Sequence, residues 1–351
     1  MSDERRPLNS TFKRAAAQSF TFPRFGFDMH SLAISFVAIA TLIASLAGLV
    51  PSLGTLVLLL AIGVCLIGMP HGSLDHLAFR RLIRRPTPLA MLLFFTLYLA
   101  VAALVIAGWY VSPLACVLVF FALSAWHFGL EEDERSSRSS LQQFAMVARG
   151  GMVIWAPALF QPAAMTDLLS MVLPIANSTT AALVVELVAA ASPALIALTL
   201  FDLWSFENPV ETSRTEAARW ELFDLATLHC VRVAALFALF AVANPLVSVG
   251  VYFCGWHSIR GLKHLHEEFS DAGGNFVVRL VPISIAALLL MLGGLVYWSS
   301  VDSFTPALVR TLFVGLSAVA VPHLLLHVVV DLLNHKSTDK LNRQSVSGVL
   351  A

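Results

Sequence analysis

Charged residues are scarce in this chain, and their scarcity excludes an ordinary soluble domain. Lys, Arg, Asp and Glu make up 13% of the 351 residues, against about a quarter in soluble proteins. Hydrophobic residues make up 58%, and the mean hydropathy is +0.80. The 22 basic and 22 acidic residues balance, so no basic surface favours a nucleic-acid partner. The composition is typical of a polytopic membrane protein.

Paired cysteines are also absent. The four cysteines all lie inside apolar runs, and none forms a CxxC pair: Cys65, Cys116, Cys230 and Cys254. The sequence therefore indicates neither a disulfide framework nor a thiolate metal site. Each cysteine is more simply a buried apolar residue.

Long apolar runs dominate what is present. A membrane-spanning helix needs about 20 apolar residues. We predict an all-α, polytopic membrane helix bundle of about ten transmembrane helices. Residues 29–336 form its single membrane domain, between polar tails at 1–28 and 337–351. The predicted spans are roughly 31–50, 55–79, 88–111, 113–130, 142–160, 180–204, 220–243, 245–268, 279–299 and 306–335. The short apolar piece 163–176 is predicted to be re-entrant or interfacial.

Basic residues follow alternate spans. With ten spans, the basic segments share one side, which the positive-inside rule makes cytoplasmic. The N-terminal tail, the segment Arg80–Arg85 and the C-terminal tail all lie on that side. We expect a protein of the inner (plasma) membrane with both termini in the cytoplasm.

Histidines lie near the cytoplasmic ends of four of these spans. His71, His127, His257 and His323 belong to the second, fourth, eighth and tenth spans. At about 1.5 Å of rise per residue, each lies within roughly 20 Å of the cytoplasmic end. Ionisable groups inside a membrane are energetically costly and usually functional. We expect one shared site, most simply a metal site.

The stretch Gly68–His76 is the densest polar intrusion in an apolar run. On a regular helix, His71 and Asp75 share a face, whereas His76 points roughly 140° away. His71 is the expected ligand. Asp75 is expected to hold an imidazole N–H, and His76 to act in positioning. The alternative is a helix end whose polar groups meet lipid headgroups.

Two further histidines are weaker candidates. His264 follows His257 by seven residues and so shares its helical face, but it stands among charged residues that suit a solvated helix end. His323 and His327 form an i, i+4 pair that can bind one metal. That pair is equally compatible with hydrogen bonds to neighbouring helices.

Neutral imidazoles suit iron, copper or zinc. An all-histidine ferrous site leaves coordination positions open for dioxygen, and a site between membrane helices is accessible to a lipophilic substrate. Three other functions compete. A membrane di-iron desaturase needs HxxHH boxes, which the sequence lacks. A bis-histidine haem protein needs histidines on facing helices. A transporter would use the histidines and Asp75 as a proton relay, and is expected to show an internal repeat that we do not find.

The sequence resembles the Brp/Blh family of β-carotene 15,15′-dioxygenases, the bacteriorhodopsin-related proteins. The resemblance rests on motifs in a fixed order over roughly residues 30–335: Gly68–His76, Ala125–His127, Tyr252–Arg260 and Val321–His323. It implies cleavage of the central double bond of β-carotene by O2 to give two all-trans-retinal. It also implies Fe(2+) held by four histidines, and a microbial rhodopsin as a functional partner.

Carried over residue by residue, the implied ligands are His71, His127 and His257, with a fourth four residues after His257. That position is Gly261 in this sequence. Three possibilities stay open. His323 or His264 supplies the fourth ligand, or the iron has three protein ligands. Alternatively, this chain is a divergent member that binds a carotenoid or another lipophile without this activity.

Overall fold

The computed structural model describes residues 29–83, 86–131, 139–173, 178–207, 216–269 and 275–349, and every regular element in these ranges is a helix. In chain order they are α2 (Met29–Leu46), α3 (Leu53–Gly63), η1 (Val64–Gly68), α4 (Met69–His71), α5 (Asp75–Leu82), α6 (Pro88–Val111), α7 (Pro113–Glu131), α8 (Ser140–Gly150), α9 (Met152–Phe160), α10 (Pro162–Val172), α11 (Ser178–Glu207), α12 (Glu216–Val242), α13 (Pro245–Gly250), η2 (Val251–Ser258), α14 (Ile259–Phe269), α15 (Phe276–Ser299) and α16 (Phe304–Val349).

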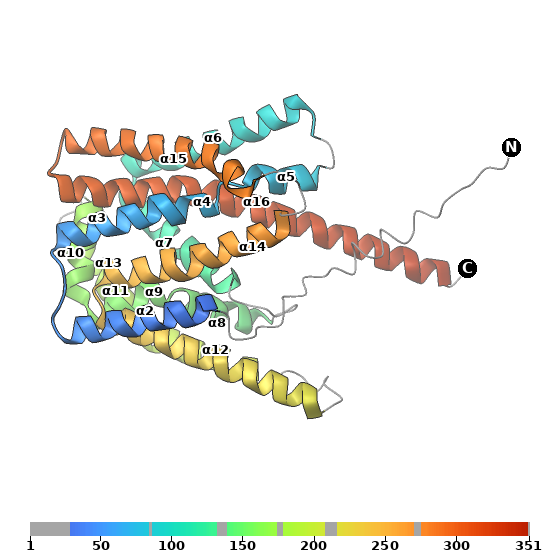
Figure 1. The fold of residues 1–351 in the computed structure, drawn as a ribbon, viewed down its shortest axis with the longest axis horizontal. Coiled ribbons are helices and arrows are strands. Elements are labelled where there is room, and N and C mark those ends of the chain that lie inside the picture. The colour runs from blue at the N-terminus through green and yellow to red at the C-terminus, as the bar shows by residue number, and fades with distance from the viewer. Residues whose placement is uncertain are drawn as a thin grey trace.

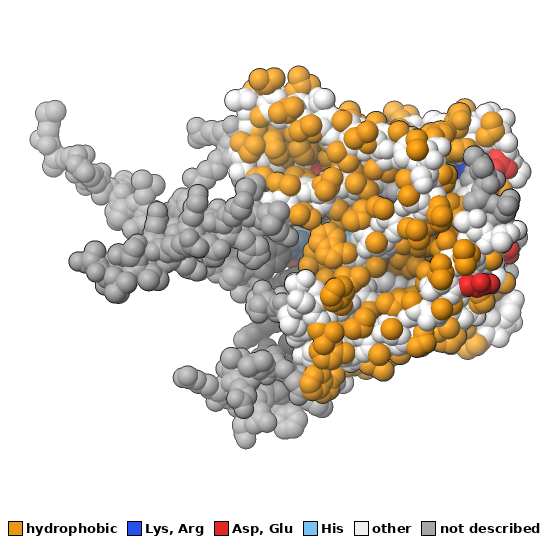
Figure 2. All heavy atoms as spheres, turned by 180° about the vertical axis from the view of Figure 1, so that it is seen from behind, with side chains coloured by type: hydrophobic (Ala, Val, Ile, Leu, Met, Phe, Trp, Pro, Cys, Tyr) orange, Lys and Arg blue, Asp and Glu red, His pale blue; other side chains and the backbone are white. Residues whose placement is uncertain are grey.

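The helices lie side by side in one bundle (Figure 1). Apolar side chains cover the face seen in Figure 2, with acidic side chains toward one end. On α6, the buried residues are Ala102 and Trp109, while leucines such as Leu89 and Leu104 are more than 70% exposed. An apolar exterior of this kind requires lipid around it. The predicted all-α membrane helix bundle is confirmed.

The predicted count of about ten transmembrane helices is not supported. Within the described ranges, six helices are long and apolar enough to cross a membrane, or seven if the bent pair α8–α9 is one span. Helices α8 and α9 meet at an angle of 58°. The described apolar parts of α2 and α12 cover only 35–46 and 229–242. Residues 245–269 form an unbroken helical run of α13, η2 and the polar α14, and this run is not among the six.

Side chains that accept from backbone amides begin several helices. Ser52, Thr87 and Ser139 each accept from the amide three residues later, at 3.2–3.3 Å. Asn244 and Asn275 each accept from the amide two residues later, at 3.0 Å. These caps satisfy N–H groups that have no partner within the helix. The helices therefore begin where short polar residues punctuate the apolar runs.

The structure describes most of the predicted C-terminal tail but none of the N-terminal one. Residues 1–28 lie outside the described ranges. At the other end, α16 continues to Val349, through most of the predicted tail 337–351.

Candidate metal centre

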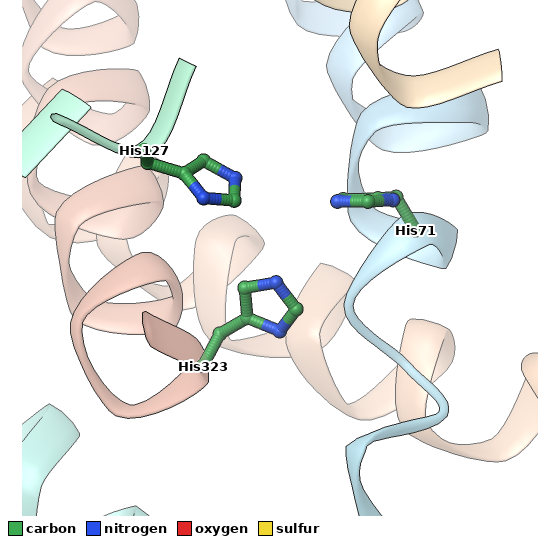
Figure 3. Close-up of side chains that lie close together, drawn as sticks. All are labelled: His71, His127 and His323. Atoms are coloured by element: carbon green, nitrogen blue, oxygen red, sulfur yellow. The ribbon is translucent and has the colours of Figure 1, made fainter. Parts of the chain in front are cut away.

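Four imidazoles from four distant helical segments meet inside the bundle. His71 ends α4, His127 lies on α7, His257 on η2 and His323 on α16. The ring of His71 lies 5.0 Å from that of His257 and 5.5 Å from that of His323, centroid to centroid. The ring of His127 lies 5.0 and 5.9 Å from the same two. The four rings close a quadrilateral, three corners of which appear in Figure 3.

Irregular helices carry two of these histidines. The π-helical turn η1 ends three residues before His71, and His257 lies within the π-helical turn η2. Gly72 ends α4, and a new helix starts at Asp75. The expected i, i+4 relation of His71 and Asp75 on one regular helix is therefore wrong, because residues 72–74 form a turn. π-Helical turns often accompany functional sites, since they re-aim side chains.

Asp75 holds the imidazole of His323. The Nδ1 atom of His323 lies 2.8 Å from Oδ1 of Asp75, and since an ionised carboxylate only accepts, Nδ1–H is the donor. The hydroxyl of Tyr98, on α6, donates to the other carboxylate oxygen at 3.0 Å. All three side chains come from different helices. The arrangement fixes the tautomer of His323 and leaves its Nε2 available as a ligand.

Glu131 plays the corresponding role for His257. Its Oε2 atom contacts Nδ1 of His257 and lies 3.8 Å from Nε2 of His127, four residues earlier on α7. His257 is buried, and Oε2 itself is inaccessible to solvent. Two histidines of the quadrilateral thus have a carboxylate at Nδ1. Such carboxylates orient metal-ligating imidazoles and raise their basicity.

Close contact between α7 and α8 fixes the end of α7 that carries His127 and Glu131. A Cβ atom on Gly129 would lie 2.4 Å from the carbonyl oxygen of Met146, and one on Gly150 2.2 Å from that of Ala125. Small residues allow such approach between membrane helices.

The buried guanidinium of Arg149 adds polar bonds beside this contact. Its NH2 group donates to the Gly129 carbonyl at 3.0 Å, and its Nε to Asp202 at 2.7 Å. A buried charge is tolerated when it is paired and hydrogen-bonded in this way. Helices α7, α8 and α11 are joined at this point.

Gly261 lies against the ring of His71. A Cβ atom at this position would come within 2.0 Å of Nδ1 and 2.1 Å of Cε1 of His71. The position where the resemblance led us to expect a fourth ligand is therefore the space that the His71 ring occupies. His323 stands at the fourth corner of the quadrilateral.

The remaining candidates lie around or away from the quadrilateral. His76 Nδ1 lies 3.2 Å from the Ser73 carbonyl, and its ring faces Phe95 of α6. His327 stacks edge-on against His323 at 4.5 Å and is exposed. His264 is exposed on α14 and belongs to none of the metal-compatible groups found among the described residues.

The donor set fits a metal ion. Ligand atoms of His71, His127 and His323 lie within 4.8 Å of one another, as do those of His71, Glu131 and His257. Both ring nitrogens of His71 are buried without a hydrogen-bond partner among the described residues. Buried polar nitrogens are nearly always paired, and a metal ion bound to one of them would supply a partner. Neutral imidazoles with outer carboxylates suit a divalent transition metal such as iron.

A mainly apolar cavity adjoins the quadrilateral. All four histidines line it, and its walls come from α3, η1, α4, α7, α9, α10, α13, η2, α15 and α16. Aromatic side chains make up much of the wall near the histidines, namely Phe120, Phe121, Phe128, Tyr252 and Phe253. The polar centre therefore faces a chamber suited to a lipophilic molecule.

Two residues of this site were not predicted from the sequence. Glu131 lies just beyond the predicted span 113–130 and was not selected, although its i, i+4 spacing from His127 was a usable signal. Tyr98 lies in an apolar run with no spacing relation to Asp75 or His323, so only the tertiary fold reveals it.

The chain is similar in sequence to known proteins. A family model described as beta-carotene 15,15'-dioxygenase matches residues 62–333. A protein named beta-carotene 15,15'-dioxygenase, from uncultured marine bacterium 66A03, is 30% identical over 271 residues, covering 75% of this chain and 90% of the relative. A second relative, from Halobacterium salinarum, is named probable beta-carotene 15,15'-dioxygenase Blh. It is 26% identical over 262 residues, covering 66% of this chain and 71% of the relative. No solved structure matches.

The matched region contains all four histidines, Asp75 and Glu131. Family, fold and site point the same way, and the expected resemblance is confirmed: this chain belongs to the β-carotene 15,15′-dioxygenase family, a family of oxidoreductases.

Proposed function

We propose that this protein cleaves the central 15,15′ double bond of β-carotene with O2 and releases two molecules of all-trans-retinal. Each carbon of the broken bond takes one oxygen atom from O2, so the reaction needs no further reductant. The observation that carries the proposal is the quadrilateral of four imidazoles at one end of an apolar cavity within a membrane bundle. The family name of the relatives agrees with it.

The proposed ligands are His71, His127, His257 and His323, and the proposed metal is Fe(2+). When bound, ferrous iron supplies the means of activating O2, which does not react with a polyene unaided. Asp75 and Glu131 contact Nδ1 of His323 and of His257, which leaves Nε2 of each imidazole as the proposed ligand atom. His327 and His76 flank the site and act in positioning.

The cavity walls have their own part in the reaction. Phe120, Phe128 and Phe253 offer flat apolar surfaces on which a conjugated chain can lie. They also keep water from the carbons of the broken bond, since a lined apolar chamber favours the polyene over water. A substrate dissolved in the lipid bilayer reaches such a chamber without entering water.

The distribution of basic residues supports a membrane location and an orientation for the protein. We propose residence in the inner (plasma) membrane with both termini in the cytoplasm, since the N-terminal tail, the segment Arg80–Arg85 and the C-terminal tail all carry basic residues, which favour the cytoplasmic side. Retinal is poorly soluble in water, and a microbial rhodopsin that binds it is the proposed functional partner.

Expression in a host that accumulates β-carotene tests the function. The intact chain should remove the orange colour and produce retinal in extracts, and His71→Ala and His323→Ala should not. Asn275→Ala, which alters an exposed helix cap that does not line the cavity, is the control for expression and membrane insertion. Unchanged carotene with well-folded protein and added iron would refute the proposal. A haem absorption band in the purified protein would favour a bis-histidine haem protein instead.

A further inference from the structure

The cavity lies on one side of the histidine quadrilateral. On α4, α7 and α16 the lining residues precede the histidine or follow it by one position, and on η2 none follows it. Contacts between successive residue pairs show that these four segments run in the same direction. The cavity therefore extends from the histidines toward their N-terminal ends. The proposed metal therefore stands at the end of a chamber and not at its middle.

Helix α10 forms the far end of this chamber. Met165, Leu168 and Leu169 line the cavity, and with Val172 they make one buried stripe at helical spacing. The opposite side of α10 is exposed at Ala163 and Asp167. At 11 residues, α10 is about 16 Å long, too short to cross the roughly 30 Å hydrocarbon core of a membrane.

Polar bonds fix both ends of α10 to the surrounding helices. Just before it, Gln161 donates to the Ala243 carbonyl at 2.7 Å. Near its end, the Arg310 guanidinium donates to the Met171 carbonyl at 2.6 Å. Arg310 is itself held by Asp302 at 2.7 Å. Charge-assisted bonds of this kind are strong where water is excluded, so α10 is a fixed floor.

The depth of the chamber follows from the helices that line it. On three of the four histidine-bearing runs, lining residues extend from Leu60 to His71, from Pro245 to His257 and from Val309 to His323, whereas on α7 they begin at Phe120. The first three intervals, of 11 to 14 residues, correspond to about 16–21 Å along a helix axis. The distance from floor to histidines is therefore between about 16 and 21 Å.

Half of a C40 carotenoid has a matching length. From its central carbon to its ring there are nine bonds of about 1.3–1.5 Å, which advance roughly 11 Å in a zigzag, and the ring brings the half to about 15 Å. A whole carotenoid, at about twice that length, does not fit between the floor and the histidines.

We propose that this chamber, closed by α10, measures one half of the substrate, so that the ring resting on Met165 and Leu168 places the central double bond at the histidines. The inference rests on the proposed function and adds its specificity-determining residues. The second half of the molecule lies outside the chamber. The cut falls at the central bond because the chamber holds one half of the molecule and the two halves are equal in length.

Raising the floor tests this directly. Leu168→Trp fills the inner end, and Ala163→Trp places the same side chain on the exposed side of the same helix. The first readout is binding of all-trans-retinol to the purified chain, since retinol has the length of one half and lacks the bond to be cleaved. Because the larger side chain takes up space that the retinol ring would occupy, Leu168→Trp should weaken retinol binding at least about tenfold. Ala163→Trp should leave retinol binding unchanged.

The second readout is the position of the cut in β-carotene. With a raised floor the ring stops nearer the histidines, so cleavage shifts from the 15,15′ bond toward the enclosed ring, giving one shorter and one longer carbonyl product. Equal retinol binding by the two variants, or retinal as the sole product of active Leu168→Trp, would overturn the chamber. Suppose that the unmodified chain binds retinol, that Leu168→Trp weakens this binding and that Ala163→Trp does not, yet the unmodified chain cleaves no β-carotene. The chamber is then supported and the proposed function is refuted.

Discussion

Replacing Gly261 by alanine should remove His71 from the metal centre. The added Cβ would lie 2.0 Å from Nδ1 of His71, whereas ordinary contacts at a Cβ begin at 3.4 Å. The ring must therefore move by more than 1 Å. Metal–ligand distances tolerate only about 0.2 Å, so a shift of that size breaks the bond.

The expected loss of iron affinity is at least 10- to 100-fold, the range found when only an outer partner of a ligand is lost. That corresponds to about 1.4–2.8 kcal/mol or more. Folding should not suffer, because alanine is favoured over glycine in a helix by about 1 kcal/mol. Competition with a chelator measures the iron affinity, and thermal unfolding of the metal-free protein measures the stability.

Gly72→Ala is the matched control. Its Cβ would lie 3.7 Å from Nδ1 of His323, an ordinary contact, so iron affinity should be unchanged. Gly261→His should fail to bind iron as the unmodified chain does, because its Cβ meets the same obstruction at His71. Full iron affinity in Gly261→Ala would refute our account of this position.

Four other substitutions test the surroundings of the centre. Glu131→Gln removes the charge beside His257 and should lower iron affinity about 10–100-fold, measured by the same competition; unchanged affinity would contradict its assigned role. Asp75→Asn should produce a loss of similar size, visible as reduced iron content after purification. His264→Ala should leave iron content and retinal yield unaltered, and a loss of either would restore it as a ligand candidate. Gly150→Leu should lower the free energy of unfolding by about 1–3 kcal/mol, seen as a lower midpoint of thermal unfolding, because its backbone packs on α7.

Much of the centre was predictable from sequence because polar residues stand out in apolar runs. His71, His127, His257 and His323 were selected by position near one end of four spans, and the structure brings all four together. The role of Asp75 was also foreseen, but as a neighbour of His71 on one helix. The turn at 72–74 redirects its carboxylate to His323, and no helical spacing predicts that contact.

The rest depended on tertiary structure. Gly261 read as a missing ligand, because a sequence does not show that the ring of His71 fills its space. Within the described ranges the count of ten spans is not supported, since α8 and α9 are bent against each other and the described apolar parts of α2 and α12 are short. The short apolar piece 163–176 was predicted not to be a span, but the place of its described part, α10, at the cavity came from the fold.

The most direct measurement is the yield of retinal from β-carotene by the purified, iron-loaded chain under O2 and in lipid. We predict two retinal molecules for each β-carotene consumed, and no retinal from His323→Ala, a variant in which iron content should also fall. Retinal formation by His323→Ala at the full rate would contradict the four-histidine centre. No retinal from the intact, folded and iron-loaded chain would contradict the assignment of β-carotene cleavage itself.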